Sequence, residues 1–437
     1  MTKRVYILGG YQSDFAQNWH RNELDLLDVF QDTIHQGLAS VDLAPNDIDV
    51  AHVGNFTAEL FCNQGHLGGF FVSSHPDFFG LPSSRHEAAC ASGSIATLAA
   101  CAEIESGRYE LAAVLGIEQM RNVPGEQAAQ NIGGPAMRSG FECQGVQYPW
   151  PHMFSELTNE YDKRYGINED HLSKISEINF ANAKKNPNSQ TRGWSFESDT
   201  FSRLDHANPV IEGRTRKMDC GQVTDGAAII FLASENKAKE YAKARSIDIA
   251  SIPFIKGWGH QTGPITYQEK IDFSKNKDYV FPHVKKAIDD AFLRAGMKGV
   301  SDIDGIETHD CFTSTEYMAI DHFGITKPGE SWKAIESGEI EIGGKIPINA
   351  SGGLIGLGHP VGATGVRMLL DCYKQCTDSA GDYQIENAKN KILQKKNIST
   401  VSASPKVRKF ARELGADINQ ISGSENRGRV VEEDIKN

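Results

Sequence analysis

Long apolar runs are missing from this 437-residue sequence. No stretch approaches the roughly 18 consecutive apolar residues that a membrane-spanning helix needs. The first residues, MTKRVYILGGYQ, hold only a short apolar run before Gly9, which is too short for the hydrophobic segment of a signal peptide. We therefore expect no membrane segment, and we interpret this start as a buried strand.

Paired cysteine motifs are also missing, although the chain has eight cysteines. No CxxC pair indicates a zinc site, and in a chain of this length the cysteines suggest no disulfide framework. The composition therefore predicts no metal and a reducing, cytoplasmic setting in which most thiols are small core residues. These cysteines are Cys62, Cys90, Cys101, Cys143, Cys220, Cys311, Cys372 and Cys376.

An excess of basic residues is likewise absent, because the formal net charge is -12. This balance argues against a general nucleic-acid-binding protein. The exception is the segment 389–437, which holds 11 Lys and Arg residues against 6 Asp and Glu. A short basic tail on an acidic body predicts a separate module with its own partner.

Strand-like and helix-like patterns alternate along most of the chain, which predicts an α/β fold with mainly parallel sheets. Between about residues 121 and 216 the pattern loosens into a segment rich in Gly, Pro, Asn, Trp and His, which we interpret as a functional lid or loop domain. The expected strands lie at 4–10, 47–56, 111–120, 226–234, 247–261 and 303–312, and the expected helices at 23–43, 87–107, 235–245 and 281–296.

Cys90 lies among small residues directly before a helical pattern, in the sequence EAACASGSIATLAA. The positive end of a helix stabilises a thiolate, so this position predicts a lowered thiol pKa. Small neighbours would admit an acyl group and leave the Cys90 backbone N–H free as an oxyanion donor. The alternative is a small buried hydrophobe, which is the commoner role of a cysteine.

A second Gly-rich turn leads into a helix at NASGGLIGLGHPVGATGVRMLLD, and it carries His359. Pro360 fits the first helical position, and a histidine near the positive helix end stays a neutral base. The dense glycines suggest close backbone approach to a ligand, although a lone histidine is more often a loop residue. His309 and Cys311 end the predicted strand at 303–312 and share one side of an extended chain.

Three motifs together, ACASG at 89–93, HDCF at 309–312 and GGLIGLGHPVGATG at 352–365, resemble the thiolase family. The HDCF box is similar to that of sterol-carrier-protein-type thiolases, whereas most other thiolases have an Asn-Glu-Ala-Phe box. The stretch DCGQVTDGAAIIFLAS from Asp219 is similar to the strand that follows the thiolase loop domain. The resemblance covers roughly residues 3 to 388.

The resemblance implies an acyl-CoA acyltransferase, either an acetyl-CoA C-acetyltransferase or a 3-oxoacyl-CoA thiolase, with CoA and acyl-CoA as substrates and no bound cofactor. Cys90 would be the acylated nucleophile, His359 would activate it and hold the enolate of the second acyl-CoA, His309 would position a catalytic water, and Cys311 would be the acid and base. Gly353, Gly358, His152 and Met153 are the further candidate substrate-binding residues, and the ligands of the CoA phosphates are expected within 121–216.

The end of the chain departs from the thiolase pattern. After the last helix, a thiolase continues into two apolar strands joined by a Gly-rich turn that supplies an oxyanion donor. Here the sequence CYKQCTDSAGDYQIENAKN runs into a lysine-rich linker instead. Loss of one such donor costs about 10²–10³ in rate, so a catalytically impaired scaffold is a second hypothesis. A carbon–carbon lyase or a relative of 3-hydroxy-3-methylglutaryl-CoA synthase is a third.

The segment that replaces these strands, SASPKVRKFARELGADINQISGSENRGRVVEEDIKN, resembles the peripheral subunit-binding domain of dihydrolipoamide acyltransferases. Its basic contact residues would be Arg408, Arg412 and Arg429, which would bind acidic groups on dihydrolipoamide dehydrogenase or another 2-oxoacid dehydrogenase subunit. A solvated basic helix is the alternative.

Together the resemblances predict two related α/β halves of a thiolase-like fold with an inserted loop domain, plus a small all-α C-terminal subunit-binding module. They also imply a homo-oligomer. The expected parts are an N-terminal half at 1–255, with its loop domain at about 121–216, a C-terminal half at 256–388, a linker at 389–401 and the module at 402–437.

Overall fold

The computed structural model describes residues 3–138, 141–386 and 388. The chain divides into two compact units, 1–388 and 389–437. The second unit, and with it Arg408, Arg412 and Arg429, lies outside the described residues. Among the described helices, none combines the length and apolar character needed to cross a bilayer.

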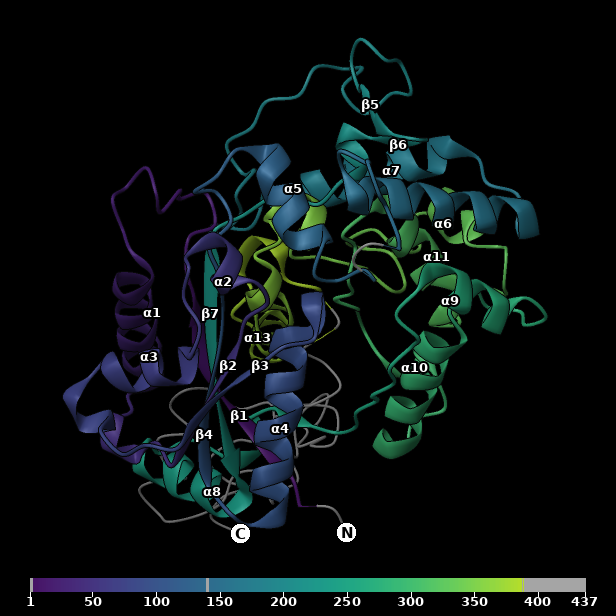
Figure 1. Cartoon of the computed structure of the whole chain (residues 1–437). Coiled ribbons are helices and arrows are strands. Elements are labelled where there is room, and N and C mark those ends of the chain that lie inside the picture. The colour runs from purple at the N-terminus through teal and green to yellow at the C-terminus, as the bar shows by residue number, and fades with distance from the viewer. Residues whose placement is uncertain (1–2, 139–140, 387, 389–437) are drawn as a thin grey trace, which may run out of the picture. The chain divides into compact units, whose positions relative to one another are not determined.

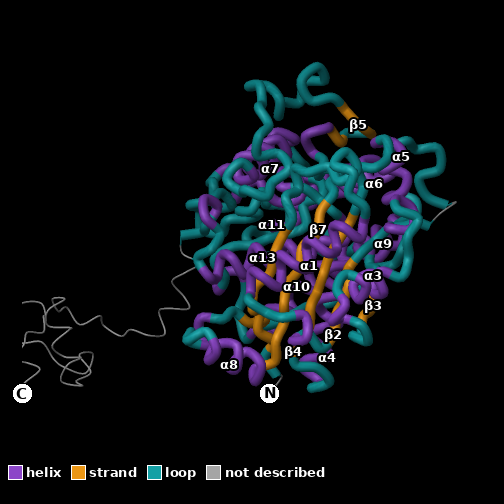
Figure 2. The backbone as a smooth tube through the Cα atoms, turned by 90° about the vertical axis from the view of Figure 1, so that its left-hand side faces the viewer, coloured by secondary structure: helices purple, strands orange, loops and turns teal. Residues whose placement is uncertain are grey.

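A six-stranded sheet forms the core of the first half, in the order β3-β2-β4-β7-β1-β8 (Figures 1 and 2). The pairs β2–β3 and β2–β4 are parallel, whereas β4–β7, β1–β7 and β1–β8 are antiparallel, so the prediction of a mainly parallel sheet is wrong. The strands are β1 (Val5–Gln12), β2 (Val50–Gly54), β3 (Ser83–His86), β4 (Leu111–Glu118), β7 (Gly226–Ser234) and β8 (Phe254–Ile255).

Both faces of this sheet are buried, because its strands carry apolar side chains on both sides. Alternate residues of β7 illustrate this: Ile229 and Phe231 belong to one apolar cluster, whereas Ile230 and Leu232 belong to another. Helices α1 (Leu26–Val41) and α3 (Leu67–Ser73) cover the first face, and α4 (Ser92–Ser106) and α13 (Thr364–Thr377) cover the second (Figure 1). The sheet is therefore the middle of three layers.

The segment that loosens in the sequence contains regular helices in the structure as well as loops. Between residues 121 and 216 the described part holds three helices and a two-stranded hairpin. The second and third of these helices share a second apolar core with the C-terminal half. The elements of the segment are α5 (Gly125–Gly133), α6 (Pro149–Tyr165), α7 (Glu169–Ala183), β5 (Val210–Glu212) and β6 (Thr215–Arg216). The other helices are α2 (Ala58–Phe61), α8 (Glu235–Ala244), α9 (Tyr267–Ser274), α10 (Pro282–Ala295), α11 (Thr313–His322) and α12 (Trp332–Glu336).

The stretches expected as strands in the C-terminal half form few ladders. Of 247–261 only β8 pairs as a strand, and 303–312 makes single bridges, Ile306 to Ile348 and Phe312 to Cys220. After α13 the described residues form a 3₁₀ turn at Gly381–Tyr383 and no further strand. Outside its helices, this half makes backbone hydrogen bonds in turns and to side chains, several of which lie at the site described below.

Helices α4 and α13 approach the sheet through glycine. A Cβ on Gly116 of β4 would lie 2.6 Å from the Ala363 Cα and from the Gly362 carbonyl oxygen. A Cβ on Gly93 of α4 would lie 2.7 Å from the same carbonyl. At these positions glycine permits backbone-to-backbone contact inside the protein. The start of α4 is thereby held against the turn that precedes α13.

We expect Gly116→Ala to destabilise the protein by about 1–3 kcal/mol, because its methyl group would overlap backbone that is held on both sides. The measurement is the midpoint of urea unfolding. Gly125→Ala is the matched control, since a Cβ there meets no atom within 4 Å. Equal stability of the two variants would contradict the close contact at Gly116.

Candidate active site

Cys90 lies in a tight turn between β3 and α4. The turn is a 3₁₀ turn at Ala89–Ala91, and Ala89 has a left-handed backbone, with φ of 49°. The Ser92 hydroxyl fixes the turn, because it accepts the Ala88 N–H at 3.0 Å and donates to the Ala89 carbonyl at 2.6 Å. Cys90 is therefore placed at the carboxyl end of β3, the edge of the sheet where α/β proteins bind ligands.

The thiol of Cys90 is held in its neutral form. Burial raises the pKa of Cys90 to about 12, and the nearby carboxyl of Glu118 adds to the rise. The residue's own backbone N–H opposes this with a smaller effect. The predicted lowering of the thiol pKa by the helix is thus not found: Cys90 lies two residues before the first residue of α4, and the loss of solvation dominates.

His359 follows a π-helical turn at Gly353–Leu357, and its backbone N–H donates to the Thr224 hydroxyl at 2.9 Å. Its ring atom Nδ1 is 2.8 Å from the Thr364 hydroxyl, which itself donates to the Pro360 carbonyl at 3.2 Å. A hydroxyl that donates its one proton there accepts from Nδ1–H, so we assign the lone pair to Nε2. The sequence predicts Pro360 as the first residue of a helix. In the structure Pro360 instead caps the 3₁₀ turn at Val361–Ala363, which precedes α13.

Burial lowers the pKa of His359 well below its usual range, and the neighbouring His309 and Arg367 lower it further. His359 is consequently a neutral base at physiological pH. It meets the requirement for a group that must accept the proton of a neutral thiol.

His309 and His359 lie next to Cys90. One ligand atom of each of the three residues lies within 4.8 Å of the others, so the cluster has the composition of a metal site as well as of a catalytic one. The two imidazole rings are edge to face, with centroids 5.4 Å apart. Burial, followed by the Arg367 charge, lowers the pKa of His309 to about 4. Its Nε2 atom is buried and has no hydrogen-bond partner among the described residues.

Cys311 faces the same cavity as Cys90 and His309. Its side chain is buried, and burial together with the charge of a Cys90 thiolate raises the pKa of Cys311 well above its usual range. Two neutral thiols and two neutral imidazoles therefore meet in one place. The structure brings together all four residues that the sequence selected as catalytic.

Two buried carboxyl groups hold the glycine-rich loop that carries His359. Asp310 accepts the backbone N–H of Leu354 at 2.6 Å and also the Asn179 amide at 3.0 Å. Glu118, on the other side, accepts the Gly362 N–H at 3.0 Å. Gly353 lies against Asp310, whose carboxylate oxygen would be 2.2 Å from an added Cβ. Burial raises the pKa of Asp310 to about 6 and that of Glu118 to about 7.

A buried cation stands behind the two imidazoles. The Arg367 guanidinium is fully buried, and its Nη1 donates to Glu307 at 3.0 Å and to Asp371 at 3.2 Å. Sequence reasoning missed Glu118, Asp310, Thr364 and Arg367. Asp310 and Thr364 lie inside the quoted motifs, but a motif does not show which of its residues bond to one another, and Asn179, a partner of Asp310, comes from a distant segment.

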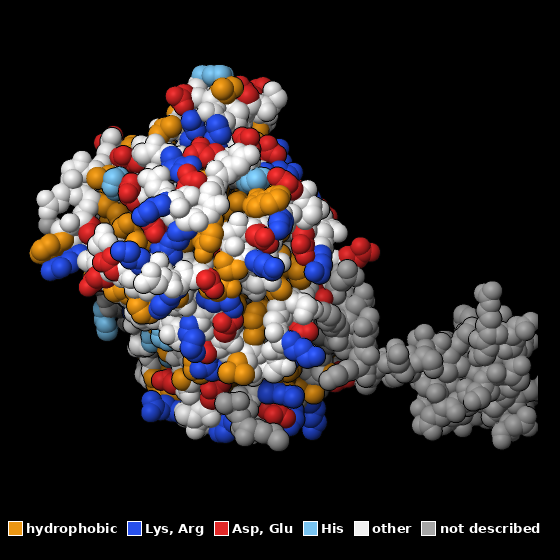
Figure 3. Space-filling model, turned by 90° about the vertical axis from the view of Figure 1, so that its right-hand side faces the viewer, with side chains coloured by type: hydrophobic (Ala, Val, Ile, Leu, Met, Phe, Trp, Pro, Cys, Tyr) orange, Lys and Arg blue, Asp and Glu red, His pale blue; other side chains and the backbone are white. Residues whose placement is uncertain are grey.

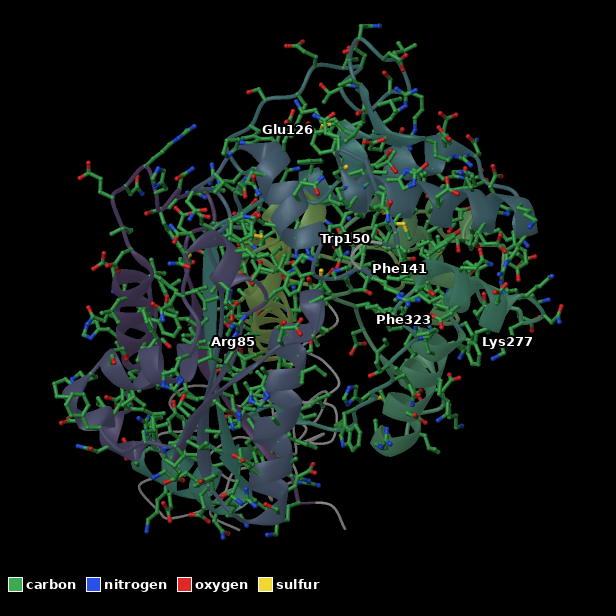
Figure 4. The ribbon with its side chains drawn as sticks, viewed as in Figure 1. Arg85, Glu126, Phe141, Trp150, Lys277 and Phe323 are labelled. Carbon is green, nitrogen blue, oxygen red and sulfur yellow. The ribbon has the colours of Figure 1, made fainter. Side chains whose placement is uncertain are left out.

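The cluster opens into a cavity of about 1010 Å³ with a mostly apolar wall. The wall residues of α6 are Trp150, Pro151 and Phe154, so His152 and Met153 of the same helix are not among them. Figure 4 labels Trp150 near the centre of the view, and its ring packs against Phe154. Gly353 and Gly358 also do not line the cavity; Gly353 shapes the loop against Asp310. Other wall residues are Phe56, Met120, Met218, Val223, Phe312 and Met368.

The basic side chains of 121–216 are mostly occupied by acidic partners. Arg203 pairs with Asp219, and Arg214 with Asp162 and Glu169. The lysines that line the cavity are Lys217 and Lys270, which both follow that segment. On the face shown in Figure 3, acidic and basic side chains are interspersed, so it carries no patch of a single sign.

Three family models match the sequence: the thiolase N-terminal domain at residues 5–193, the thiolase C-terminal domain-like model at 266–404, and the e3 binding domain at 401–436. An acetyl-CoA acetyltransferase of Methanocaldococcus jannaschii is 30% identical over 376 residues, 85% of this chain and 89% of the relative. One of Methanothermobacter thermautotrophicus is 29% identical over 93% of this chain and 99% of the relative.

A sterol carrier protein 2 of Gallus gallus is 27% identical over 90% of this chain and 69% of its own length. Among solved structures, an Ltp2-ChsH2(DUF35) aldolase aligns with a TM-score of 0.66 at 19% identity, over 88% of this chain and 92% of that one. A human mitochondrial 3-ketoacyl-CoA thiolase in complex with CoA aligns with a TM-score of 0.57 at 16% identity, over 87% and 93%. These structures share the fold.

The neutral state of Cys90 predicts a particular pH dependence of its alkylation. Because the thiolate is the reactive form and the thiol pKa is raised to about 12, the rate with iodoacetamide should rise about tenfold per pH unit between about pH 7 and pH 9. The rate is measured by mass spectrometry of the peptide that contains Cys90. A rate that is high and constant below pH 7 would indicate a thiolate–imidazolium pair and would contradict the assignment.

Proposed function

The chain belongs to the thiolase family, and from this membership and the geometry of the Cys90 cluster we propose that it is an acyl-CoA acyltransferase that works through an acyl-thioester on Cys90. The observation that carries the proposal is the placement of a neutral thiol beside a neutral imidazole in an apolar cavity. Similarity to two acetyl-CoA acetyltransferases supports acetyl-CoA as a substrate.

In the first half-reaction the Cys90 sulfur attacks the thioester carbonyl of an acyl-CoA while His359 Nε2 takes the thiol proton. The tetrahedral intermediate collapses, CoA leaves as a thiol with that proton, and the acyl group stays on Cys90. The Cys90 backbone N–H is the candidate donor to the oxyanion, as the sequence suggested. The acyl group is carried by the protein itself, so the proposal requires no metal or organic cofactor.

In the second half-reaction the Cys311 thiol gives its proton to a neutral imidazole of the cluster, and the Cys311 thiolate then removes a proton from the α-carbon of a second acyl-CoA. The resulting carbanion attacks the acyl carbonyl on Cys90, the carbon–sulfur bond to Cys90 breaks, and a 3-oxoacyl-CoA is released. The Cys90 thiolate takes back the proton from the imidazolium, which restores the neutral cluster. His359 and His309 face the same space, and the unpartnered His309 Nε2 is available to the enolate oxygen or to a water that contacts it. A thiol with a raised pKa gives a strongly basic thiolate, which suits Cys311 to proton transfer at carbon.

Lys217 and Lys270 are the proposed ligands of the CoA phosphates, because they are the lysines on the cavity wall. The Lys270 ammonium donates to the Ile265 carbonyl at 2.7 Å, and burial lowers its pKa. An anionic group beside it would restore its usual pKa. The large residues of α6 then line the path of the acyl chain.

The intact cluster favours this enzyme over the impaired scaffold. The family's second oxyanion donor comes from strands after the last helix, and the described residues form no strand there. The chemistry proposed above takes its donors and bases from Cys90, His309, Cys311 and His359, which all line the cavity. A lower rate than that of a complete thiolase is the expected consequence.

Incubation of the full chain with acetyl-CoA should leave one acetyl group on Cys90, seen by mass spectrometry. Thiolysis of acetoacetyl-CoA should fall by at least about 10³-fold in Cys90→Ala, since removal of a covalent nucleophile abolishes the acyl-enzyme route. Cys372→Ala is the matched control, because Cys372 lies on the exposed side of α13. An equal rate in wild type and Cys90→Ala would overturn the enzyme proposal.

The C-terminal segment is proposed to dock the enzyme onto a 2-oxoacid dehydrogenase complex. Support comes from the match to the e3 binding domain and from the basic charge of 389–437. The proposed contact residues are Arg408, Arg412 and Arg429, and the proposed partner is dihydrolipoamide dehydrogenase or a related subunit. Assembly of the catalytic part as a homo-oligomer and a cytoplasmic setting are further parts of the proposal.

Binding to dihydrolipoamide dehydrogenase should be strong at low salt and weaken as salt rises, because basic side chains meet acidic ones. The double variant Arg408→Ala with Arg429→Ala should weaken binding by at least about tenfold, measured by titration calorimetry. A double variant of the linker, Lys395→Ala with Lys396→Ala, removes the same charge and should bind nearly normally. Absence of a complex at low salt would remove the docking proposal.

A further inference from the structure

We propose that Cys90, His309 and His359 bind a Zn²⁺ ion, which blocks the acyl-transfer site reversibly. One ligand atom from each residue lies within 4.8 Å of the other two, and among the described residues this is the one group of that composition and spacing. Zinc–sulfur bonds of about 2.3 Å and zinc–nitrogen bonds of about 2.0 Å place neighbouring ligand atoms about 3.3–3.7 Å apart. Side-chain rotations that shift each ligand atom by about 1 Å therefore bring the three atoms to the distances that the ion requires.

The unpartnered His309 Nε2 is an independent indication of a ligand at this place. Its atom is buried and makes no hydrogen bond among the described residues, which is unfavourable unless something else occupies the position. The other close pair of histidines differs in this respect, because His52 contacts the His86 ring at 2.9 Å and Glu103 at 3.2 Å. Of the two pairs, only the one beside Cys90 leaves a buried ring nitrogen free.

The surroundings of His359 resemble those of a metal-binding histidine. Its Nδ1 is 2.8 Å from the Thr364 hydroxyl, which fixes the ring and leaves Nε2 as the nitrogen available to a ligand. Metal-ligating histidines commonly use one ring nitrogen for the metal and the other for a protein hydrogen bond. One sulfur and two imidazole nitrogens select Zn²⁺ over Mg²⁺ or Ca²⁺, which prefer oxygen ligands.

Binding forms a Zn–S bond and breaks the S–H bond of Cys90, whose proton passes to the solvent. No electron is transferred, and a water from the cavity completes the tetrahedron. The ion and the acyl group need the same sulfur, so each excludes the other. This inhibition rests on the proposed function, whereas the binding of the ion does not.

The test titrates the chelator-treated full chain with ZnCl₂ in a calorimeter and with CoCl₂ in a spectrophotometer, where cobalt bound to a thiolate gives an intense near-ultraviolet absorption. We expect one ion per chain, and a loss of affinity of at least about tenfold in Cys90→Ala and in His309→Ala. Cys372→Ala with Cys376→Ala removes the exposed cysteine pair of α13 and should bind as wild type does. Unchanged affinity in Cys90→Ala, or loss of binding only in the α13 double variant, would overturn the proposal.

A second arm separates this inference from the proposed function. Acetyl-CoA added first should acetylate Cys90 and prevent the cobalt–thiolate absorption. Acetylation of Cys90 in a protein that binds no Zn²⁺ would refute the metal site and leave the acyltransferase intact. Binding of Zn²⁺ through Cys90 in a protein that acetyl-CoA never acetylates would support the metal site and refute the acyltransferase.

Discussion

The site depends on the buried carboxyl group of Glu118, at the end of β4. It accepts the backbone N–H groups of Phe56 and Thr57, the Asn55 side-chain amide, and the Gly362 N–H that lies 244 residues away in the sequence. The ends of β2 and β4 are thereby tied to the turn that follows His359. This hydrogen bond to Gly362 adds to the glycine contacts that hold the turn after His359 against the start of α4, the helix that follows Cys90.

The Glu118 carboxyl group also affects the reactivity of Cys90. Its negative charge adds to the burial that keeps the Cys90 thiol neutral, and the buried Arg367 cation adds to the burial that keeps His359 neutral. Both charges oppose a resting thiolate–imidazolium pair. Proton transfer from Cys90 to His359 is therefore unfavourable before a substrate binds, and hydrogen-bond donors to the thioester oxygen must stabilise the negative charge that moves onto it. A substrate-free thiol is correspondingly unreactive.

Much of this arrangement could be predicted from the sequence, because the motifs carry the reacting residues. The α/β class, the four catalytic candidates and the two turn-to-helix segments follow from short patterns around Cys90, His309 and His359. Strand direction did not follow, because an alternating pattern does not show that β7 pairs antiparallel to both β1 and β4. The thiol pKa did not follow either, since it depends on burial by distant segments, which no local pattern reports.

Glycine and large apolar residues have different roles at the site, as the starts of α4 and α13 show. Each helix is preceded by a 3₁₀ turn, at Ala89–Ala91 and at Val361–Ala363, and the two turns meet because Gly93 and Gly116 allow backbone contact. Small residues near Cys90 are thus required for the contact between the turns, so these positions cannot vary to change the shape of the substrate cavity. The shape of the cavity must come from its large wall residues, Trp150 and Phe154 of α6 and Met368 of α13. Since these α6 side chains lie in the loop domain of the N-terminal half and do not form the catalytic turns, substitutions at Trp150 and Phe154 can change the accepted acyl group without disturbing those turns.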